Sequence, residues 1–387
     1  MSVFSTCPDR FHSPSSKYNR EFLKDIYGTD DLRPLWVADQ DFVCPPPILE
    51  HFKEKTEFGV FGYEYRPNSF HAAVEKWFER KYNVAIDPLK VQYSPTIMTS
   101  MAMALELFTN PGEGVIIQPP VYMEFKNTVE KSGRTVATNP LVIENERYVM
   151  DYLDLEQKAS LPYNTAMLLC NPHNPGGRVW SKEELKKVVE ICVKYDILLI
   201  SDEIHADIIY SGHAFNSMLH FEEMYDNLMV CYSPGKVFNI ASLSDSMAII
   251  PSDEMRDAFN ALRLKYNLGR TNAFARLAME MGFSQCDQWL SDLLSTLEQN
   301  RDTMNHFISF EIPQIKMMIP EGTYLAWLDI SSLKMSSKEA IRHFAKYGIG
   351  LNPGNDFGEN GEGYVRMNFA CTPDTINAAL VRLQQSV

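Results

Sequence analysis

The sequence predicts an α/β protein, with a large domain built on a mostly parallel sheet and a smaller α+β domain. In the middle of the chain, short apolar runs bounded by polar, glycine or proline residues alternate with amphipathic stretches. Such runs are typical of strands that are buried on both faces, with helices between them. The C-terminal part differs, because a long amphipathic segment is followed by short strand-like pieces. We therefore predict a large domain over residues 45–280 and a small domain over residues 1–44 and 281–387.

Five apolar runs are the predicted strands of the large domain. They are residues 115–117, 166–170, 197–200, 228–231 and 247–250. The best-marked helix lies between the second and the third run. Ser181 and Glu184 form a capping box there, and apolar residues follow at helical spacing. The unit from Thr165 to Ile200 is therefore predicted to be a βαβ crossover.

The predicted elements of the C-terminal part are helices and short strands. They are a long helix over 285–308, strands near 316–319 and 324–328, a helix that Ser336 and Glu339 begin and Gly348 ends, a half-exposed strand over 365–369, and a terminal helix after Thr372 with Pro373 at its first position.

Composition and charge exclude several classes of function. Hydrophobic residues make up 45% of the chain and charged residues 22%, as in soluble globular proteins. The net charge of −14 disfavours a nucleic-acid or membrane-surface partner. No apolar stretch approaches the roughly 18 residues of a membrane span, and residues 1–7 lack the features of a secretory signal. Seven widely spaced cysteines argue against a disulfide framework or a zinc site, so we expect a cytoplasmic protein without a metal.

Lys236 follows the apolar run at 228–231 and is the first candidate for chemistry. A lysine at the end of a buried strand can hold an aldehyde cofactor as a Schiff base. Burial disfavours its ammonium form, so the amine can act as nucleophile and general base. The alternative is an ordinary surface lysine, which is far more common. The neighbouring strand ends decide between the two.

Two of those strand ends carry polar side chains, and ligands bind at the carboxyl ends of strands in open α/β sheets. Asp202 follows the run at 197–200. It is either a helix cap or the partner of a protonated pyridine nitrogen. Asn174 follows the run at 166–170 among two Asn-Pro steps and two glycines. It either belongs to a rigid turn or donates to an oxygen on a ring above Asp202.

Two further segments suggest where a phosphate and a flat ring would bind. Residues 94–100 precede a helix-like segment from Met101 to Phe108, and backbone N–H groups at a helix start bind phosphate. Ser233 could add a hydroxyl to the same phosphate. Tyr122, after the run at 115–117, is either a stacking residue or an ordinary tyrosine with a buried ring and a solvated hydroxyl.

Taken together, these segments make the chain resemble the fold-type I pyridoxal 5′-phosphate (PLP) enzymes. Within them it is similar to the MalY/PatB cystathionine β-lyase family of the aminotransferase class I/II superfamily. The resemblance covers nearly the whole chain, and several separated motifs occur in the family's order. The most specific motifs are residues 34–42, 59–63, 170–180, 201–207, 233–239, 321–324 and 353–366.

The resemblance implies a role for each matching residue and a homodimer with shared active sites. For the cofactor, it implies Lys236 as the Schiff-base lysine that also moves the Cα proton, Asp202 as the partner of the pyridine nitrogen, Asn174 and His205 as contacts of the ring oxygen, Tyr122 as the stacking residue, Ile97 and Met98 with Ser233 as the phosphate site, and Tyr63 as a phosphate ligand of the neighbouring subunit. For the substrate, it implies Arg366 as the clamp of the α-carboxylate, with Val37 and Ala38 closing over it.

The family resemblance also implies a reaction. We expect a C–S β-lyase that converts cystathionine or other S-substituted cysteines, small amino-acid substrates, to thiol, pyruvate and ammonia. The alternatives are an aminotransferase of a small amino acid and a regulatory protein on this scaffold. The family usually has methionine at Gln40, glycine at Thr96, serine or threonine at Gly235, threonine or alanine at Val237, and glycine at Ser242. These departures concern the reaction and the substrate more than the cofactor.

Overall fold

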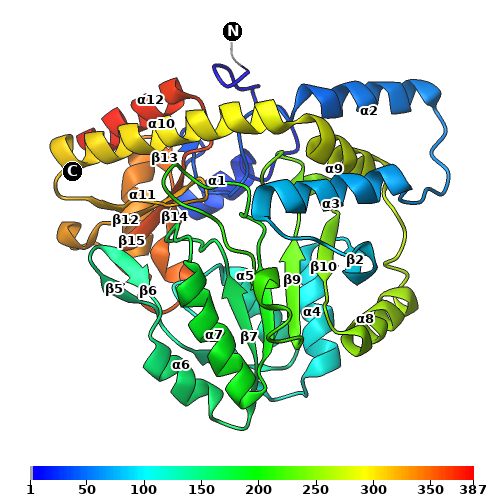
Figure 1. Cartoon of the computed structure of the whole chain (residues 1–387). Helices are drawn as coiled ribbons and strands as arrows, with labels where there is room; N and C mark the ends of the chain where they lie inside the picture. The colour runs from blue at the N-terminus through cyan, green and yellow to red at the C-terminus, as the bar shows by residue number, and fades with distance from the viewer. Residues whose placement is uncertain (1–2) are drawn as a thin grey trace.

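The computed structural model describes residues 3–387; Met1 and Ser2, which begin the segment predicted to contain no secretory signal, lie outside them. Its centre is a seven-stranded sheet of order β2-β10-β9-β8-β7-β3-β4 (Figure 1). The strands are β2 (Val91–Ser94), β10 (Ser246–Ile249), β9 (Leu228–Tyr232), β8 (Leu198–Asp202), β7 (Asn164–Cys170), β3 (Gly114–Ile117) and β4 (Thr135–Thr138). The pairs from β9 to β4 are parallel, and β10 is antiparallel to both of its neighbours. The predicted mostly parallel sheet is confirmed.

Both faces of this sheet are covered by helices, which explains the continuous apolar runs. In β7, Met167 and Leu169 pack into one hydrophobic core, while Ala166 and Leu168 pack into the other. The helices of the large part of the chain are α2 (Pro46–Phe58), α3 (Asn68–Tyr82), α4 (Ile97–Phe108), α5 (Met123–Lys131), α6 (Tyr152–Ala159), α7 (Lys182–Tyr195), α8 (Asp253–Lys265) and α9 (Ala273–Gln285). Helix α7 begins at the predicted capping box.

Helix α4 begins earlier than the sequence suggested. We expected a helix-like segment from Met101, but the first helical residue is Ile97. Thr96 caps it, because its side chain accepts a hydrogen bond from the Thr99 N–H at 3.1 Å. The prediction missed the cap because Thr96 lies only three residues before another threonine and no acidic residue follows it in the first turn. The earlier start places the backbone N–H groups of Ile97 and Met98 in the first turn of the helix.

The C-terminal part forms a second sheet, of order β11-β12-β15-β14. Its elements are α10 (Asp287–Glu311), β11 (Lys316–Met318), β12 (Leu325–Asp329), α11 (Ser337–Lys346), β14 (Asn352–Pro353), β15 (Tyr364–Asn368) and α12 (Pro373–Gln385). Helix α10 runs across the top of Figure 1 and packs against α12. The prediction of a half-exposed strand at 365–369 is wrong. Residues 365–368 are buried, because β15 lies inside this sheet between β12 and β14.

The N-terminal segment joins the C-terminal part. Strand β1 (Arg33–Pro34) pairs in parallel with β13 (Ile349–Gly350). The remaining elements are α1 (Arg20–Tyr27), the hairpin of β5 (Val142–Glu144) and β6 (Arg147–Val149), and 3₁₀ turns at Pro88–Lys90, Met218–Phe221, Ala241–Leu243, Ser331–Leu333 and Gly354–Phe357. The predicted domain limits stay a prediction; the limit at residue 280 falls inside α9.

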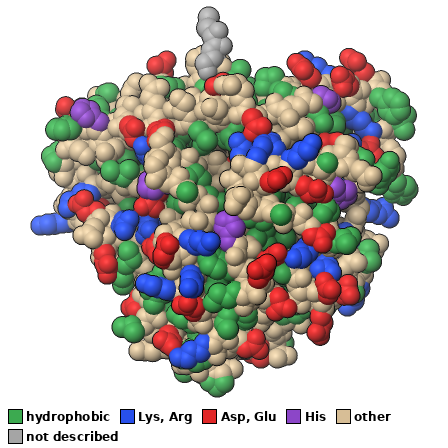
Figure 2. All heavy atoms as spheres, viewed as in Figure 1, with side chains coloured by type: hydrophobic (Ala, Val, Ile, Leu, Met, Phe, Trp, Pro, Cys, Tyr) green, Lys and Arg blue, Asp and Glu red, His purple; other side chains and the backbone are tan. Residues whose placement is uncertain are grey.

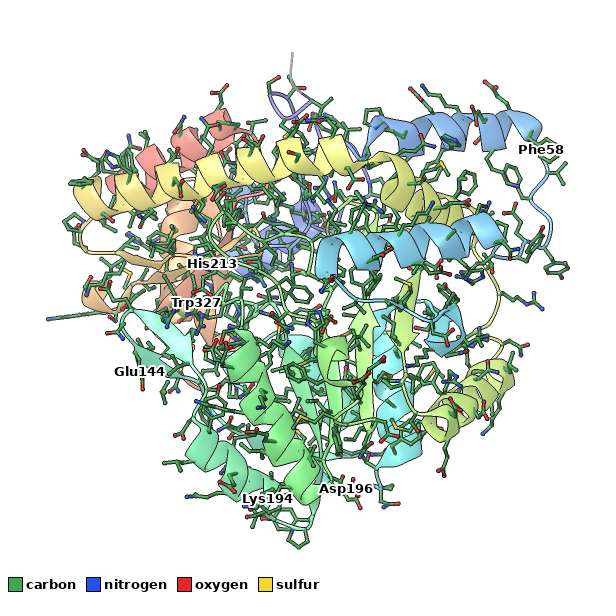
Figure 3. The ribbon with its side chains drawn as sticks, in the orientation of Figure 1. Phe58, Glu144, Lys194, Asp196, His213 and Trp327 are labelled. Atoms are coloured by element: carbon green, nitrogen blue, oxygen red, sulfur yellow. The ribbon has the colours of Figure 1, made fainter. Side chains whose placement is uncertain are left out.

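Acidic and basic side chains are interspersed over the face shown in Figure 2. Hydrophobic side chains gather at its upper right edge, beyond the end of α2, where Figure 3 places Phe58. The exposed large hydrophobic residues of the segment 58–65 are Phe58, Val60, Phe61, Tyr63 and Tyr65. Within residues 3–387, no helix is long and apolar enough to cross a membrane.

Candidate active site

A cavity of about 390 Å³ opens where β7, β8 and β9 end and α4 begins. This is the edge of the sheet at which the sequence predicted a ligand. The predicted site residues that line it are Val37, Ala38, Ile97, Met98, Tyr122, Asn174, Asp202, His205, Ser233, Lys236 and Arg366. They come from seven separate segments of the chain. The structure thus brings together every predicted site residue except Tyr63.

Lys236 follows β9 in a turn and lines the cavity. Its Nζ donates a hydrogen bond to the Ala38 carbonyl oxygen at 2.5 Å. Burial and, to a lesser extent, the positive charge of Arg366 lower the pKa of the amine to about 8, against the opposing effect of Asp39 and Asp202. A lysine in this state loses its proton near neutral pH, as a nucleophile or base requires.

This lowered pKa predicts how Lys236 reacts in the cofactor-free protein. An amine reacts with electrophiles only when deprotonated, and a pKa of about 8 means that Lys236 is half deprotonated at a lower pH than an ordinary lysine, whose pKa is 10.5. We expect the acylation rate of Lys236, followed by peptide mass spectrometry, to rise with pH to a midpoint near 8. The exposed Lys194, whose pKa is raised by Glu156, is the internal reference and should still be rising at pH 10. A midpoint for Lys236 equal to that of Lys194 would contradict the buried amine.

Asp202 is the last residue of β8 and is only 3% exposed. Its Oδ1 accepts a hydrogen bond from the Ile204 N–H at 3.0 Å, and burial raises its pKa to about 7. Near it, His205 packs edge-on against Tyr324, with ring centroids 5.8 Å apart. Burial lowers the pKa of His205 well below 6.5, so the ring is neutral. The His205 Nδ1 atom is buried without a hydrogen-bond partner among the described residues.

Arg366 crosses from the second sheet into the cavity and meets Asn174. Its Nη1 donates to the Asn174 Oδ1 atom at 3.1 Å, and its Nη2 donates at 2.7 Å to both the Trp36 carbonyl and the Asn352 Oδ1 atom. All of these acceptors are uncharged. Among the ion pairs of residues 3–387, none includes Arg366. A buried guanidinium without a carboxylate partner is able to bind an anionic ligand.

The segment from Trp36 to Asp41 supplies backbone acceptors, and its residues 36–38 line the cavity. The carbonyl oxygens of residues 36, 37 and 38 accept hydrogen bonds from Arg366, Asn368 and Lys236, respectively. A charged network also holds this segment through the side chains of Asp39 and Asp41. Lys17, itself 1% exposed, donates to Asp41 at 2.9 Å, and Arg10 bonds both Asp39 and Asp41. This segment is therefore held both by its backbone carbonyls and by its acidic side chains.

The sequence reasoning missed Asn352, Asn368, Arg10, Lys17 and the side chain of Gln40 as parts of this site. Asn352 lies one residue before the Pro353-Gly354 motif, and β14 pairs it with Arg366. Its position next to that motif was the available signal. Arg10 and Lys17 lie in the N-terminal segment and follow no strand. Nothing in the sequence pattern connects them to residues 39–41, so their contacts emerge only from the fold.

The predicted phosphate end of the cavity lies at the start of α4. The first N–H groups of a helix have no partner within the helix, and those of Ile97 and Met98 border the cavity. The Ser233 hydroxyl also lines it, but its proton goes to the Asp245 carbonyl oxygen at 2.8 Å. A phosphate would therefore have to compete with Asp245 for the Ser233 hydroxyl.

Of the two tyrosines predicted to contact the cofactor, Tyr122 lines the cavity of its own chain and Tyr63 does not. Tyr122 lines the cavity at the start of α5, and burial raises its pKa to about 12. Tyr63 lies outside the cavity and is 92% exposed, in the segment between α2 and α3. The Arg270 guanidinium lies over its ring at 5.4 Å. Tyr63 thus does not reach the site of its own chain.

These groups fit PLP. A buried carboxylate can face the ring nitrogen, an amide and a neutral histidine can face the ring oxygen, a buried amine can meet the aldehyde, and a helix start can hold the phosphate. The unpartnered His205 Nδ1 atom is an orphan that such a ligand would satisfy. No group of three His, Cys, Asp or Glu side chains in the described part of the chain is arranged to hold a metal ion.

Comparison with known proteins identifies the family. The chain is 37% identical over 386 residues to cystathionine β-lyase PatB of Bacillus subtilis, and this match covers 99% of each of the two proteins. It is 30% identical over 392 residues to protein MalY of Escherichia coli, covering 100% of this chain and 99% of MalY. Cystalysin from Treponema denticola, whose structure contains a PLP cofactor, superposes with a TM-score of 0.93 at 30% identity, over 99% of this chain and 98% of cystalysin. The family model for aminotransferase class I and II matches residues 39–383. The resemblance seen in the sequence is confirmed: the chain belongs to the aminotransferase class I and II family.

Proposed function

We propose that this protein is a PLP-dependent C–S β-lyase that cleaves cystathionine or another S-substituted cysteine. One observation carries the proposal. In a chain that matches a cystathionine β-lyase along its whole length, a single cavity holds a buried amine of lowered pKa, a buried carboxylate and a buried guanidinium without a carboxylate partner. These are the groups that an amino-acid substrate and a pyridine cofactor require.

The chain's own residues divide the work. Arg366 holds the substrate α-carboxylate in a bidentate fashion, and the Trp36 carbonyl and the Asn352 side chain orient its guanidinium. When bound, PLP draws electrons from the Cα–H bond and makes its proton acidic. Lys236, as a free amine, takes that proton. The Cβ–S electron pair then leaves with sulfur, which takes up a proton to become the thiol, and one water completes the conversion to pyruvate and ammonia.

Two product assays test the reaction. The lyase should release pyruvate and a thiol from cystathionine or from a panel of S-substituted cysteines, without any added keto acid. An aminotransferase, which would use the same residues, should instead release no thiol and require a keto acid as acceptor. If none of the S-substituted cysteines yields pyruvate, the lyase function is wrong. A protein that binds no PLP would also exclude the aminotransferase and leave the regulatory alternative.

Replacing Arg366 with lysine should weaken substrate binding. Lysine keeps the charge but loses the planar fork that reaches Asn174 and Asn352 together. We expect kcat/KM to fall about 10²-fold, from the loss of about 2 to 3 kcal/mol of charged hydrogen bonding. PLP affinity should change little. The control is Arg134→Lys, at a buried arginine that bonds Thr109 away from the cavity; an equal loss there would contradict a specific role for Arg366.

We further propose a homodimer in which each chain completes the other's site. The exposed segment 58–65 carries four aromatic residues and a valine in water, which is unusual for a free surface. A second copy of the chain would bury this segment and bring Tyr63 to the partner's phosphate.

The two-domain division at residues 45 and 280 and a cytoplasmic location are also proposed. All seven cysteines in the described residues are free thiols, as is usual in reducing compartments.

Mixed dimers test the role of Tyr63. Tyr63→Ala should weaken PLP binding about tenfold to hundredfold, because a hydrogen bond to a charged phosphate is lost. Lys236→Ala should be inactive. When the two variants are unfolded and refolded together, one site in each mixed dimer receives Lys236 from one chain and Tyr63 from the other. Each mixed dimer should then regain about half of the wild-type activity. No recovery would show that Tyr63 does not act across subunits.

A further inference from the structure

Gln40 is fully buried and uses its amide on the turn that carries Lys236. Its Nε2 donates two hydrogen bonds, to the Lys236 carbonyl oxygen at 2.7 Å and to the Val237 carbonyl oxygen at 2.9 Å. Its Oε1 atom is buried and has no partner among residues 3–387. The polar part of this side chain therefore bonds nothing but the lysine turn. A buried oxygen without a hydrogen-bond partner lowers the stability of the fold. The favourable contribution of the Gln40 amide therefore comes from its two hydrogen bonds to the turn.

The two carbonyls that Gln40 binds are those that the turn itself leaves open. The preceding carbonyls, of Pro234 and Gly235, accept hydrogen bonds from the N–H groups of Phe238 and Ile240 within the turn. Gln40 thus completes the hydrogen bonding of the turn from a segment almost two hundred positions earlier in the chain. One of the two carbonyls belongs to Lys236 itself, so Gln40 holds the backbone from which the Lys236 side chain extends.

The same two segments are tied together a second time. Asn239 donates from its Nδ2 to the Gln40 carbonyl at 3.0 Å and to the Phe42 carbonyl at 2.8 Å. Asn239 has a φ of 56°, a left-handed conformation that asparagine adopts more easily than most residues. Two residues before Gln40, the Ala38 carbonyl accepts the Lys236 amine. One short segment therefore holds Lys236 at both ends, the backbone through Gln40 and the amine through Ala38.

We propose that Gln40 is the positioning residue for Lys236 and sets the reach of its amine toward the aldehyde of the cofactor. This rests on the proposed function only in that the cofactor is PLP. Bond formation joins the amine nitrogen to the aldehyde carbon and releases the aldehyde oxygen as water with two protons of the amine. Gln40 takes no part in these transfers. It fixes where the nitrogen lies when they occur.

A pair of ligands isolates this role. PLP can bond to Lys236, whereas pyridoxine 5′-phosphate has an alcohol in place of the aldehyde and cannot. Dissociation constants of both are measured by fluorescence on cofactor-free wild type, Gln40→Met and Lys236→Ala. Methionine has a similar length but no donor. We expect Q40M to bind PLP about tenfold more weakly and pyridoxine 5′-phosphate as the wild type does. K236A should lose most of the preference for PLP.

The control is Gln118→Met, at a second buried glutamine whose Nε2 donates to the Asn139 Oδ1 atom at 2.9 Å, away from the cavity. Q118M should change neither constant. Gln40→Glu, a substitution of equal size, provides a second test if Q40M does not fold. Its carboxylate cannot donate, so the PLP affinity relative to wild type should be lowest at high pH and recover as the carboxyl is protonated.

The possible results distinguish the role of Gln40 from the proposed function. A parallel loss of both ligands in Q40M would show that Gln40 only shapes the cavity, and unchanged PLP affinity in Q40M and Q40E would show that it positions nothing. Either result overturns the proposal. A wild-type protein that binds PLP but forms no pyruvate would refute the proposed lyase reaction alone. A wild type that binds neither ligand would refute the PLP function and with it this role of Gln40.

Discussion

Replacing Lys236 with alanine is expected to reduce kcat by at least about 10⁴-fold, the largest effect of any single change in this chain. Alanine removes both the amine that bonds the cofactor and the base that takes the Cα proton. The absorbance band of the lysine-bound cofactor should disappear as well. PLP should still bind, because the helix start at Ile97, the Asp202 carboxylate and the Asn174 amide remain. Spectroscopy and pyruvate release measure the two effects on one preparation.

Two comparisons make this prediction specific. Lys194→Ala changes an exposed lysine that pairs with Glu156, and it should leave activity and absorbance as in the wild type. Added methylamine can enter the space that Lys236 vacates, so it should restore a small, concentration-dependent part of the K236A activity. A K236A protein that keeps its absorbance band, or more than about one hundredth of its activity, would assign the chemistry to a different amine.

The large sheet and its ligand-binding edge could be predicted because local pattern and burial agree there. In β7 and β8, alternate apolar residues pack into the two hydrophobic cores on opposite faces of the sheet. A continuous run of apolar residues in the sequence therefore identifies a strand that is buried on both faces. The strand ends then follow from where the apolar run stops. Asn174 and Asp202 were found in this way. Their meeting with Lys236 follows from the parallel order of β7, β8 and β9.

The contacts between distant segments could not be predicted from pattern. Arg366 lies in β15, whose alternation of apolar and polar residues suggested a half-exposed strand. In the fold its polar positions face the cavity and the Trp36 segment instead, and Asn368 donates to the carbonyls of Val37 and Asp39 at 2.6 Å. Period-two alternation reports that the two faces differ, but it does not say whether the polar face meets water or a buried site.

The N-terminal network shows the same limit more strongly. Lys17 is buried, and its ammonium group pairs with the carboxylates of Asp39 and Asp41. The same carboxylates also accept hydrogen bonds from Arg10, and Asp41 accepts one from the Tyr18 hydroxyl. Sequence reasoning treats a lysine as exposed, since burial of one is rare. A buried lysine becomes predictable only when its partners are known to be neighbours, and that information is in the tertiary structure.

Asp202→Asn should be the second most damaging change, with a fall in kcat of about 10³-fold. Asparagine keeps the size of the side chain and its place at the end of β8, but it carries no charge to hold the ring nitrogen protonated. The matched control is Glu203→Gln. Glu203 is a buried carboxylate with a pKa also raised to about 7, but its oxygens accept hydrogen bonds from Ser217 and the Met218 N–H, and it does not line the cavity.

The pH dependence distinguishes charge from shape at Asp202. Because burial raises its pKa to about 7, the carboxyl in the cofactor-free protein is neutral below that pH and charged above it. Wild-type PLP affinity should therefore fall as pH decreases through 7, in a step separate from the one near 8 that Lys236 causes. D202N should lack the step near 7 and keep the other, whereas E203Q should keep both and unfold at a lower temperature. If D202N retained the lower step or half of its kcat, the carboxylate would not act on the ring nitrogen, and the pairing inferred from the position of Asp202 at the end of β8 would be wrong.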